Sequence, residues 1–480
     1  MTTQTLTLDF VPSAVQAQFH ANAPHFSITS PSTQTIIATV RDNSADDARR
    51  AIEQSVAAFE SWRQTSAFER SRLMRAWFNL MMEHTDAIAR LTSMEMGKPI
   101  SEARGEVRYA AGFIEWFAEE AKRAYGEIVP PHDVNKRLFV LRQPVGPVYG
   151  ITPWNFPSAM ITRKVGPALA AGCTFILKPA EQSPLTALYL AHLWEQVGGP
   201  AGTFIVCPTN DAKAFSQPFF DDARIRKLTF TGSTEVGKIL YAQSAATMKR
   251  LSLELGGHAP FLIFADADIG QAVKEVVASK FRNAGQTCVC ANRIYVHESI
   301  QADFCQQLTA AVKALRVGDP LEDSTQIGPL VDAQGLEKVV AHVADAVEKG
   351  AQVLTGGTVG DGLYYMPTVL MNVQPGMRVM EEETFGPVAP VTAFATDADA
   401  IRMANDTPYG LAAYLYTRDL TRAIRMAEAL EYGIVGLNDG LPSTPQVPFG
   451  GVKQSGIGRE GGPWGLAEYL DIKYVSLGLK

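Results

Sequence analysis

The run Val148-Tyr149-Gly150-Ile151 begins the stretch of sequence that decides the fold. Short apolar runs alternate here with helical patterns: the runs lie at 148–151, 174–177, 204–206 and 228–230, and the helical patterns at 158–171, 184–197 and 234–244. Short buried strands that alternate with helices are typical of an α/β fold with a doubly wound parallel sheet. Such sheets bind ligands at the carboxyl ends of their strands, so functional residues are expected in the loop after each strand.

The flanking sequence predicts further elements. Apolar residues at helical spacing predict helices at 44–62, 67–93 and 101–125, and a strand is predicted at 138–141. Gly256-Gly257 marks a boundary, after which a helix at 268–283 leads toward Cys288. Later strand-like runs lie at 353–355 and 434–438, and the tail at 469–479 alternates like a strand but has no obvious local partner.

Composition excludes several classes of protein. The 480 residues include 46% hydrophobic and 19% charged residues, which is the reverse of a disordered chain, and the length predicts two or three domains. No stretch approaches the ~18 uncharged apolar residues of a membrane span. The net charge of −7 and the lack of a Lys/Arg run argue against a nucleic-acid or anionic-membrane partner. The start, 1–4, has no signal-peptide features. We expect a large soluble enzyme.

The cysteines and histidines indicate the compartment and argue against a metal. An odd, sparse set of cysteines is not a disulfide framework and predicts a reducing, cytoplasmic location. The eight histidines form no HExxH motif and no Cys/His pairs, so we expect no metal. The five cysteines are Cys173, Cys207, Cys288, Cys290 and Cys305.

Cys288 is the first candidate nucleophile. It follows Asn-Ala-Gly-Gln-Thr at the junction of a helix and a loop, where glycine allows the backbone to approach a substrate closely. The alternative is a small buried hydrophobic residue, which is the usual role of a free cysteine.

Two further residues could assist a nucleophile. Glu254 stands in an apolar run at the end of a predicted strand, where burial would raise its pKa toward the range of a general base. It could instead cap backbone amides. Asn155 lies in the loop Pro153-Trp154-Asn155-Phe156-Pro157, directly after a strand, and could donate to an oxyanion; the alternative is a stiff turn.

The cofactor motif is weaker on general rules. Gly232-Ser233-Thr234-Glu235-Val236-Gly237 follows a predicted strand and begins a helix, but its spacing is neither GxGxxG nor that of a Walker A loop. A helix N-terminus after a parallel strand nevertheless suits a pyrophosphate. Many such turns are only structural.

Together these motifs resemble the aldehyde dehydrogenase superfamily. Six collinear motifs, which span essentially the whole chain, carry the resemblance: Pro-Trp-Asn-Phe-Pro (153–157), Phe-Thr-Gly-Ser-Thr-Glu-Val-Gly (230–237), Leu-Glu-Leu-Gly-Gly (253–257), Asn-Ala-Gly-Gln-Thr-Cys (283–288), Glu-Glu-Thr-Phe-Gly-Pro (382–387) and Pro-Phe-Gly-Gly-Val-Lys-Gln-Ser-Gly (448–456). The resemblance implies a doubly wound dinucleotide-binding domain and an α/β catalytic domain, joined by a small bridging β unit. The implied ranges are 1–125 and 145–254 for cofactor binding, 255–440 for catalysis, and 126–144 and 441–480 for bridging and oligomerisation.

The succinate-semialdehyde dehydrogenases are the most similar subgroup, on residues 113–123, 159–166 and 281–293. An anionic semialdehyde needs cations in the tunnel, and arginine offers bidentate carboxylate recognition. The resemblance assigns Arg163 and Arg282 to the substrate carboxylate, with Ser443 assisting. Each arginine taken alone could be a surface charge or part of a structural ion pair.

The resemblance also implies a mechanism and a cofactor site. Cys288 would form a thiohemiacetal and then a thioester, Asn155 would hold the oxyanion, and Glu254 would activate the hydrolytic water. Phe156 and Phe449 would line the tunnel. Lys178 and Glu181 would lie at the adenosine ribose, where a carboxylate favours NAD over NADP, although NADP remains possible if Glu181 turns to solvent. The implied cofactor-binding residues are Trp154, Lys178, Glu181, Gly232, Ser233, Leu255, Glu383 and Phe385.

Two further expectations concern regulation and assembly. Cys290 could form a disulfide with Cys288 and block it, or it could be a packed small residue. The tail strand at 473–477 would expose an edge in a monomer, so a homodimer or homotetramer is expected.

The alternatives that remain open concern substrate and class. Glutarate semialdehyde is the nearest rival substrate, because one methylene is worth only ~1–3 kcal/mol in a pocket. A broader aldehyde dehydrogenase, a CoA-acylating relative, a cofactor-free cysteine hydrolase with Glu254 as base, and a non-catalytic binding protein are the other readings.

Overall fold

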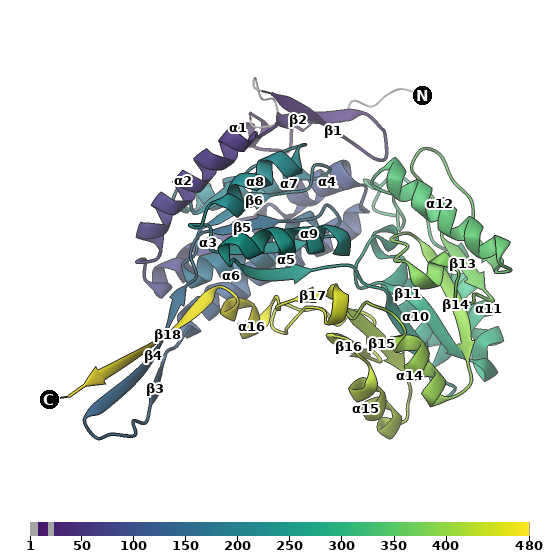
Figure 1. Ribbon diagram of the computed structural model, residues 1–480. Coiled ribbons are helices and arrows are strands. Elements are labelled where there is room, and N and C mark those ends of the chain that lie inside the picture. The colour runs from purple at the N-terminus through teal and green to yellow at the C-terminus, as the bar shows by residue number, and fades with distance from the viewer. Residues whose placement is uncertain (1–7, 18–23, 480) are drawn as a thin grey trace.

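The computed structural model describes residues 8–17 and 24–479, so the start of the chain at 1–4 lies outside the described residues. Two α/β bodies lie side by side, and an arm of strands projects from the first of them (Figure 1). Two large hydrophobic clusters fill the bodies, one built mainly from residues before 205 and one from residues 259–432. No helix within the described residues is long and apolar enough to cross a membrane.

The first body contains the predicted doubly wound sheet. Its strand order is β17-β9-β8-β5-β6-β7, and all neighbours are parallel except β17 with β9. The strands are β5 (Val148–Ile151), β6 (Phe175–Lys178), β7 (Phe204–Val206), β8 (Lys227–Thr231), β9 (Arg250–Glu254) and β17 (Gly456–Ile457). The helices between and after them are α6 (Pro157–Ala171), α7 (Pro184–Gln196), α8 (Ala212–Asp221) and α9 (Thr234–Ser244).

The N-terminal part of the chain covers this body. Its elements are α1 (Ser13–Gln16), β1 (His25–Thr29), β2 (Ile36–Arg41), α2 (Ala45–Trp62), α3 (Ala67–Glu83), α4 (Thr85–Met96) and α5 (Ile100–Glu120). The single helix predicted at 67–93 is two helices, because His84 leaves helical geometry with φ −92° and ψ 14°. The Thr85 hydroxyl donates back to Met82 O at 2.7 Å, and the apolar spacing continues across this break.

The second body is built on a seven-stranded sheet of order β12-β13-β14-β11-β10-β15-β16. Only the edge strand β12 is antiparallel to its neighbour. The strands are β10 (Ala259–Ile263), β11 (Ala291–His297), β12 (Gln352–Thr355), β13 (Thr368–Met371), β14 (Val388–Phe394), β15 (Ala412–Tyr416) and β16 (Ile434–Leu437). The helices are α10 (Ile269–Lys280), α11 (Gln301–Lys313), α12 (Ala333–Glu348), α13 (Arg378–Glu381), α14 (Asp397–Asn405) and α15 (Leu420–Ala429).

The connection between the bodies determines where a site can form. Strand β9 ends at Glu254 and β10 begins at Ala259, so four residues carry the chain from one sheet to the other. The carboxyl edge of the first sheet therefore adjoins the amino edge of the second. Residues that follow strands in the first body meet residues that precede strands in the second.

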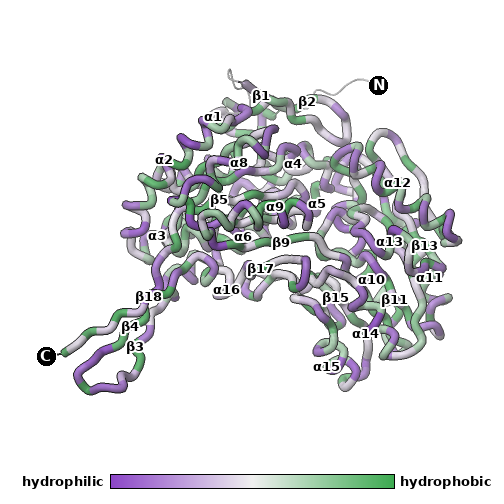
Figure 2. Tube along the Cα trace, viewed as in Figure 1, coloured by the Kyte–Doolittle hydropathy of each residue, from purple (hydrophilic) through white to green (hydrophobic). Residues whose placement is uncertain are grey.

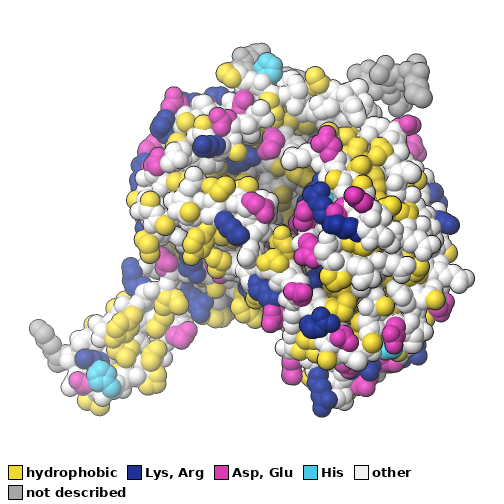
Figure 3. Space-filling model, turned by 45° about the vertical axis from the view of Figure 1, so that its right-hand side comes forward, with side chains coloured by type: hydrophobic (Ala, Val, Ile, Leu, Met, Phe, Trp, Pro, Cys, Tyr) yellow, Lys and Arg dark blue, Asp and Glu magenta, His cyan; other side chains and the backbone are white. Residues whose placement is uncertain are grey.

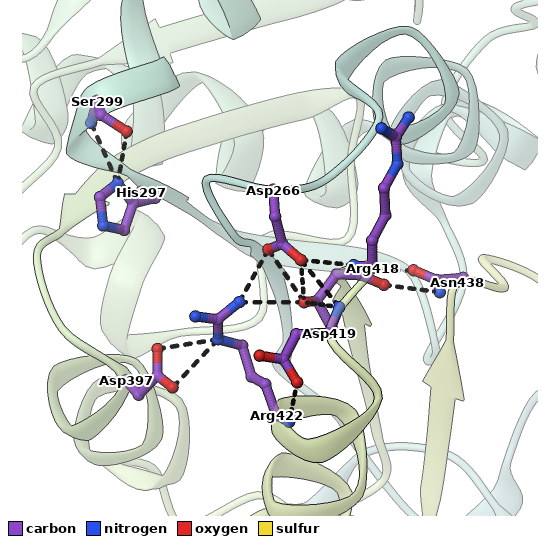
Figure 4. A network of polar contacts seen from close by, with 9 residues as sticks. Asp266, His297, Ser299, Asp397, Arg418, Asp419, Arg422 and Asn438 are labelled. Carbon is purple, nitrogen blue, oxygen red and sulfur yellow. Dashed lines mark hydrogen bonds and ion pairs between the residues drawn. The ribbon is translucent and has the colours of Figure 1, made fainter.

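The opposite, carboxyl edge of the second sheet is held by a polar network (Figure 4). Asp266, after β10, accepts hydrogen bonds from the Thr417 hydroxyl, from the backbone N–H groups of Arg418 and Asp419, and from Arg422. These contacts fix the loop between β15 and α15. The Asp266 carboxylate therefore has a structural role.

The projecting arm is a three-stranded antiparallel sheet of order β18-β4-β3. Its strands are β3 (Glu127–Val129), β4 (Lys136–Pro144) and β18 (Leu470–Gly478), and the tail strand pairs with β4 from Leu470↔Pro144 to Gly478↔Lys136. Hydrophobic side chains lie on the arm in the space-filling view of Figure 3, and hydrophobic and hydrophilic residues alternate along its backbone in Figure 2. The rest of 441–480 differs from the expected bridging segment, because β17 joins the first sheet and α16 (Gly462–Ala467) packs on α5 and α6.

Candidate active site

A cavity of about 330 Å³ lies where the two bodies meet. Its wall contains six residues predicted from the sequence: Phe156, Arg163, Arg282, Cys288, Ser443 and Phe449. Because these come from α6, from the loop before β11 and from the late loop, the structure brings together residues up to 293 positions apart, as between Phe156 and Phe449. The nucleophile candidate and both arginines thus share one space.

Cys288 is positioned by a strained loop. Between α10 and β11, Asn283 and Ala284 adopt φ +52° and +54°, and Gly285 follows at φ +76°. A Cβ on Gly285 would overlap Gly386 O, and one on Gly257 would lie 2.5 Å from Cys288 O. Gly285 therefore lets the backbone of Gly386 approach closely. The sequence analysis suggested that the substrate makes this close approach.

The thiol of Cys288 is held in its neutral form. Burial raises the pKa of Cys288 to about 12, and the nearby carboxyls of Glu383 and Glu254 raise it further, while Arg163 opposes them. Reaction at neutral pH requires a group that removes the proton.

Glu254 is buried at the end of β9, as the sequence predicted. Burial, and then the charge of Glu460, raise its pKa well above the usual range, whereas Arg163 and Lys164 lower it. Its Oε2 has no hydrogen-bond partner within the described residues. The alternative role of capping backbone amides finds no support in the hydrogen bonds of these residues, and this buried oxygen is left without a protein partner.

Asn155 follows β5 in a loop that is held from several sides. Its Nδ2 donates to Gln286 O at 3.1 Å, and its backbone oxygen accepts from Lys98 Nζ at 2.7 Å and from Asn283 Nδ2 at 3.1 Å. The side chain is thus oriented toward the loop that carries Cys288.

Lys98 and Glu106 hold this loop, and the sequence analysis missed both. They form an ion pair that is 0% and 1% exposed, and Lys98 Nζ lies 3.6 Å from the centre of the Phe156 ring. Glu106 Oε1 accepts from the N–H groups of Ser158 and Ala159, at the start of α6, which has no side-chain cap of its own. The sequence did contain a signal for Glu106, because it is an acidic residue on the apolar face of the helix predicted at 101–125.

The two arginines differ in their partners. Arg163 is 2% exposed, forms an ion pair with Glu460, which also pairs with Lys164, and stacks on Phe449 with 3.8 Å between Cζ and the ring centre. Arg282 lies over Phe156 at 5.3 Å and forms no ion pair within the described residues. Of the two, Arg282 is therefore the freer to bind an anion.

Ser443 and a residue absent from the sequence prediction face each other in the cavity. The Tyr109 hydroxyl and the Ser443 hydroxyl lie 2.5 Å apart. Tyr109 is on α5, which also supplies Glu102 and Glu106 to the wall. Helix α5 was predicted as an element, but its contribution to the site was not.

Four predicted cofactor residues lie at or just after the carboxyl ends of β6 and β8: Lys178, Glu181, Gly232 and Ser233. Lys178 Nζ contacts Glu181 at 3.0 Å, and the Glu181 side chain is 46% exposed. The Ser233 hydroxyl caps the start of α9 by accepting from Val236 N at 3.3 Å, and Gly232 N donates to Glu254 O at 3.0 Å. A helix N-terminus, a lysine and a carboxylate are donors and acceptors that suit a dinucleotide.

The remaining cofactor candidates lie near one another. Glu383 Oε1 accepts from Gly257 N at 3.3 Å, a Cβ on Gly256 would lie 3.2 Å from Glu383 Oε2, and burial raises the pKa of Glu383 to about 7. Trp154 and Phe385 meet edge to face with ring centres 5.7 Å apart. Leu255 packs against Gly237, where a Cβ would overlap its side chain.

A model of the aldehyde dehydrogenase family matches residues 19–475. The chain belongs to this family. The resemblance and the fold class inferred from the motifs are therefore confirmed, and the protein is an oxidoreductase.

Relatives of this aldehyde dehydrogenase are similar over almost their whole length. A succinate-semialdehyde dehydrogenase of Escherichia coli, named for NADP(+), is 52% identical over 460 residues, which are 95% of each chain. A glutarate-semialdehyde dehydrogenase of Pseudomonas putida is 51% identical over 456 residues, again 95% of each chain. A crystal structure of an aldehyde dehydrogenase from Brucella melitensis biovar abortus has a TM-score of 0.96 and 50% identity, covering 99% of this chain and 100% of that one.

Cys290 of this aldehyde dehydrogenase is buried and faces away from the cavity wall. Its sulfur lies 3.5 Å from Lys280 Nζ, from Asn292 Oδ1 and from Gly285 O, and burial raises its pKa. The predicted redox switch with Cys288 remains a prediction. All five cysteines are free.

Proposed function

We propose that this aldehyde dehydrogenase oxidises succinate semialdehyde to succinate with a nicotinamide dinucleotide. One observation carries the proposal: Cys288, Arg163 and Arg282 line the same cavity. A thiol and two guanidinium groups in one space suit a substrate with an aldehyde at one end and a carboxylate at the other. The E. coli relative named for this substrate supports the assignment.

In the proposed reaction the Cys288 thiolate attacks the aldehyde carbon and forms a tetrahedral thiohemiacetal. The amide of Asn155 and the N–H of Cys288 stabilise its oxyanion, and Arg282 and Arg163, with Ser443, hold the distal carboxylate. The bound cofactor supplies the hydride acceptor. Phe156 and Phe449 keep competing water from the tunnel.

Glu254 completes the proposed cycle. As a carboxylate it takes a proton from water, the resulting hydroxide attacks the thioester carbon, and the Cys288 thiolate leaves as succinate forms. The unpartnered, buried Oε2 supports this role. Glu254 also assists removal of the Cys288 proton before the first attack and releases that proton to solvent before the thioester is hydrolysed.

For the cofactor, Lys178, Glu181, the start of α9 at Gly232 and Ser233, and Glu383 would hold the dinucleotide, with Trp154, Leu255 and Phe385 packing beside it. The carboxylate of Glu181 alone suggested NAD. Its 46% exposure allows it to turn from a 2′-phosphate and leaves Lys178 to bind that group, and the E. coli relative is named for NADP(+). We therefore propose NADP as the preferred nucleotide and NAD as the alternative.

Glutarate semialdehyde is the second candidate substrate, because the P. putida relative named for it is nearly as similar. The test is kcat/KM for succinate semialdehyde, glutarate semialdehyde and uncharged butanal, each with NAD and with NADP. We expect succinate semialdehyde with NADP to give the highest value. Equal efficiency on butanal would contradict the roles of Arg163 and Arg282, and aldehyde-dependent reduction of the cofactor separates this enzyme from a hydrolase.

The division into domains, the oligomeric state and the location belong to the same proposal. We propose that residues 1–125 and 145–254 bind the cofactor and that 255–440 carry catalysis. We also propose self-association through the arm, since β18 has a partner strand on one side only within the described residues. The free state of all five cysteines supports a reducing compartment, as expected for the cytoplasm.

A further inference from the structure

Glu102 is a carboxyl group in the cavity wall that the proposed reaction does not use. It stands on α5, one turn before Glu106, and one of its oxygens accepts from Asn283 N at 2.8 Å. That bond links it to the loop of Arg282 and Cys288. In a pocket that binds an anion, the negative charge of this carboxylate would repel the substrate. Its presence there therefore requires an explanation.

The charged groups around the cavity leave two without partners. Glu106 pairs with Lys98, and Arg163 and Lys164 pair with Glu460. Neither Glu102 nor Arg282 forms an ion pair within the described residues.

Several groups face Glu102. Burial has the largest effect and raises the pKa of Glu102, whereas Lys98, the Asn283 N–H and Arg282 lower it, in that order, and Glu106 raises it slightly. On the neighbouring helices, the Glu95 carboxyl of α4 is bound to the N–H groups that begin α7, and Arg163 and Lys164 of α6 are paired with Glu460. Because Lys98 is already paired with Glu106, Arg282 is the cation beside Glu102 that has no carboxylate partner within the described residues.

We propose that binding of the anionic aldehyde at Arg282 is coupled to the uptake of one proton by Glu102. This rests on the carboxylate recognition proposed above. When the substrate carboxylate reaches Arg282, it brings a like charge toward Glu102 and shares the cation that had stabilised it. A proton from solvent then neutralises Glu102, and nothing else is consumed.

The pH range follows from the free protein. Burial raises the pKa of Glu102 to about 7. Below that pKa, Glu102 is already protonated. The affinity for the anion is then greatest and does not depend on the ionisation of Glu102. Above it, binding must take up a proton, so affinity falls as the pH rises. A further rise of one pKa unit on binding corresponds to about tenfold in affinity across the titration.

The test is calorimetric binding of succinate semialdehyde to Cys288→Ala protein saturated with NADP, from roughly pH 6 to 8.5, in pairs of buffers with different heats of ionisation. Butanal is the uncharged control. The second protein carries Glu102→Gln as well, which keeps an oxygen for Asn283 N, and its thermal unfolding verifies that it is folded.

We expect Cys288→Ala protein to take up protons with the semialdehyde above pH 7 and to lose about tenfold in affinity. Glu102→Gln should abolish the uptake and keep tight binding at high pH, and butanal should bind without uptake. No uptake by the parent, or unchanged uptake after Glu102→Gln, would overturn the coupling while leaving carboxylate recognition intact. Equal affinity for butanal and the semialdehyde would overturn both.

Discussion

Cys288 and Glu254 lie in surroundings that disfavour their charged forms, and this sets the chemistry at the scale of single residues. Burial raises both pKa values, and the carboxyl of Glu254 adds to the shift at Cys288. The reactive thiolate is therefore a minor species near neutrality, and the basic carboxylate of Glu254 is less populated than that of an ordinary glutamate.

The first prediction concerns pH. Because both raised pKa values favour the protonated forms, the active ionisation state becomes more populated as pH increases, and kcat should rise between about pH 7 and 9. Stopped-flow measurement of the NADPH burst reports the steps up to hydride transfer. A burst rate that falls as the pH rises over this range would contradict the roles assigned to Cys288 and Glu254.

The second prediction concerns the pair of Lys98 and Glu106. Lys98→Met leaves a buried carboxylate without its cation and should lower the free energy of unfolding by about 3–5 kcal/mol. Urea unfolding measures this loss. The double variant Lys98→Met/Glu106→Gln removes both charges and should recover most of it; no recovery would show that the charge pair is not the cause.

At the residue scale, motifs in the sequence named Cys288, Arg163, Arg282 and Ser443. The structure brings these four residues into one cavity, and their roles stay predictions. Glu102, Lys98 and Tyr109 were missed, since each lies on or beside a helix whose apolar spacing was noted without asking which polar residues share its inner face.

At the scale of elements, the site forms between the carboxyl edge of one sheet and the amino edge of the other. The rule of reading the loop after each strand finds Asn155 after β5, Lys178 and Glu181 with β6, and Gly232 after β8. It fails in the second body, where Cys288 precedes β11 and Glu383 precedes β14. There the carboxyl edge holds the Asp266 network (Figure 4).

The third prediction tests the loop that delivers Cys288. Gly285→Ala places a Cβ against Gly386 O at φ +76°, so the loop must move, and we expect kcat to fall by at least about tenfold, with a loss of ~1–3 kcal/mol in stability. Gly270→Ala in α10 is the matched control, since its Cβ meets only Asp268 Oδ1 at 3.5 Å. Equal behaviour of the two variants would contradict the loop's role.

The ends of helices were predictable where the spacing of apolar residues stops. The helices α6, α7 and α9 begin and end within one or two residues of their predicted bounds. The break at His84 was not predictable, because it depends on backbone angles and on a hydroxyl contact that apolar spacing does not record.

At the scale of the whole molecule, the arm extends hydrophobic surface away from both bodies (Figure 3). Its exposed side chains include Ile128 at 76%, Ile472 at 73% and Tyr474 at 61%. Hydrophobic patches on an unpaired sheet edge are typical of an interface. The alternation of the tail indicated an exposed edge without naming a partner strand, whereas the resemblance joined the tail with 126–144, and the tail pairs with β4.

The fourth prediction follows from this surface. Ile472→Lys together with Tyr474→Glu should convert the oligomer into a smaller species, because it places charges at the proposed contact. Light scattering after size exclusion measures the mass. Phe68→Lys, at another exposed hydrophobic residue, is the control and should leave the mass unchanged. A parent protein that is already monomeric would contradict the proposal.

The central claim is that Cys288 carries the acyl group of succinate semialdehyde until Glu254 releases it. The most direct measurement is mass spectrometry of Glu254→Gln protein after prolonged mixing with succinate semialdehyde and NADP at about pH 9, where hydroxide removes the Cys288 proton in place of Glu254. The account predicts one succinyl group on the peptide that contains Cys288, formed together with one equivalent of reduced cofactor. Reduced cofactor without this adduct, or an adduct on another residue, would contradict it.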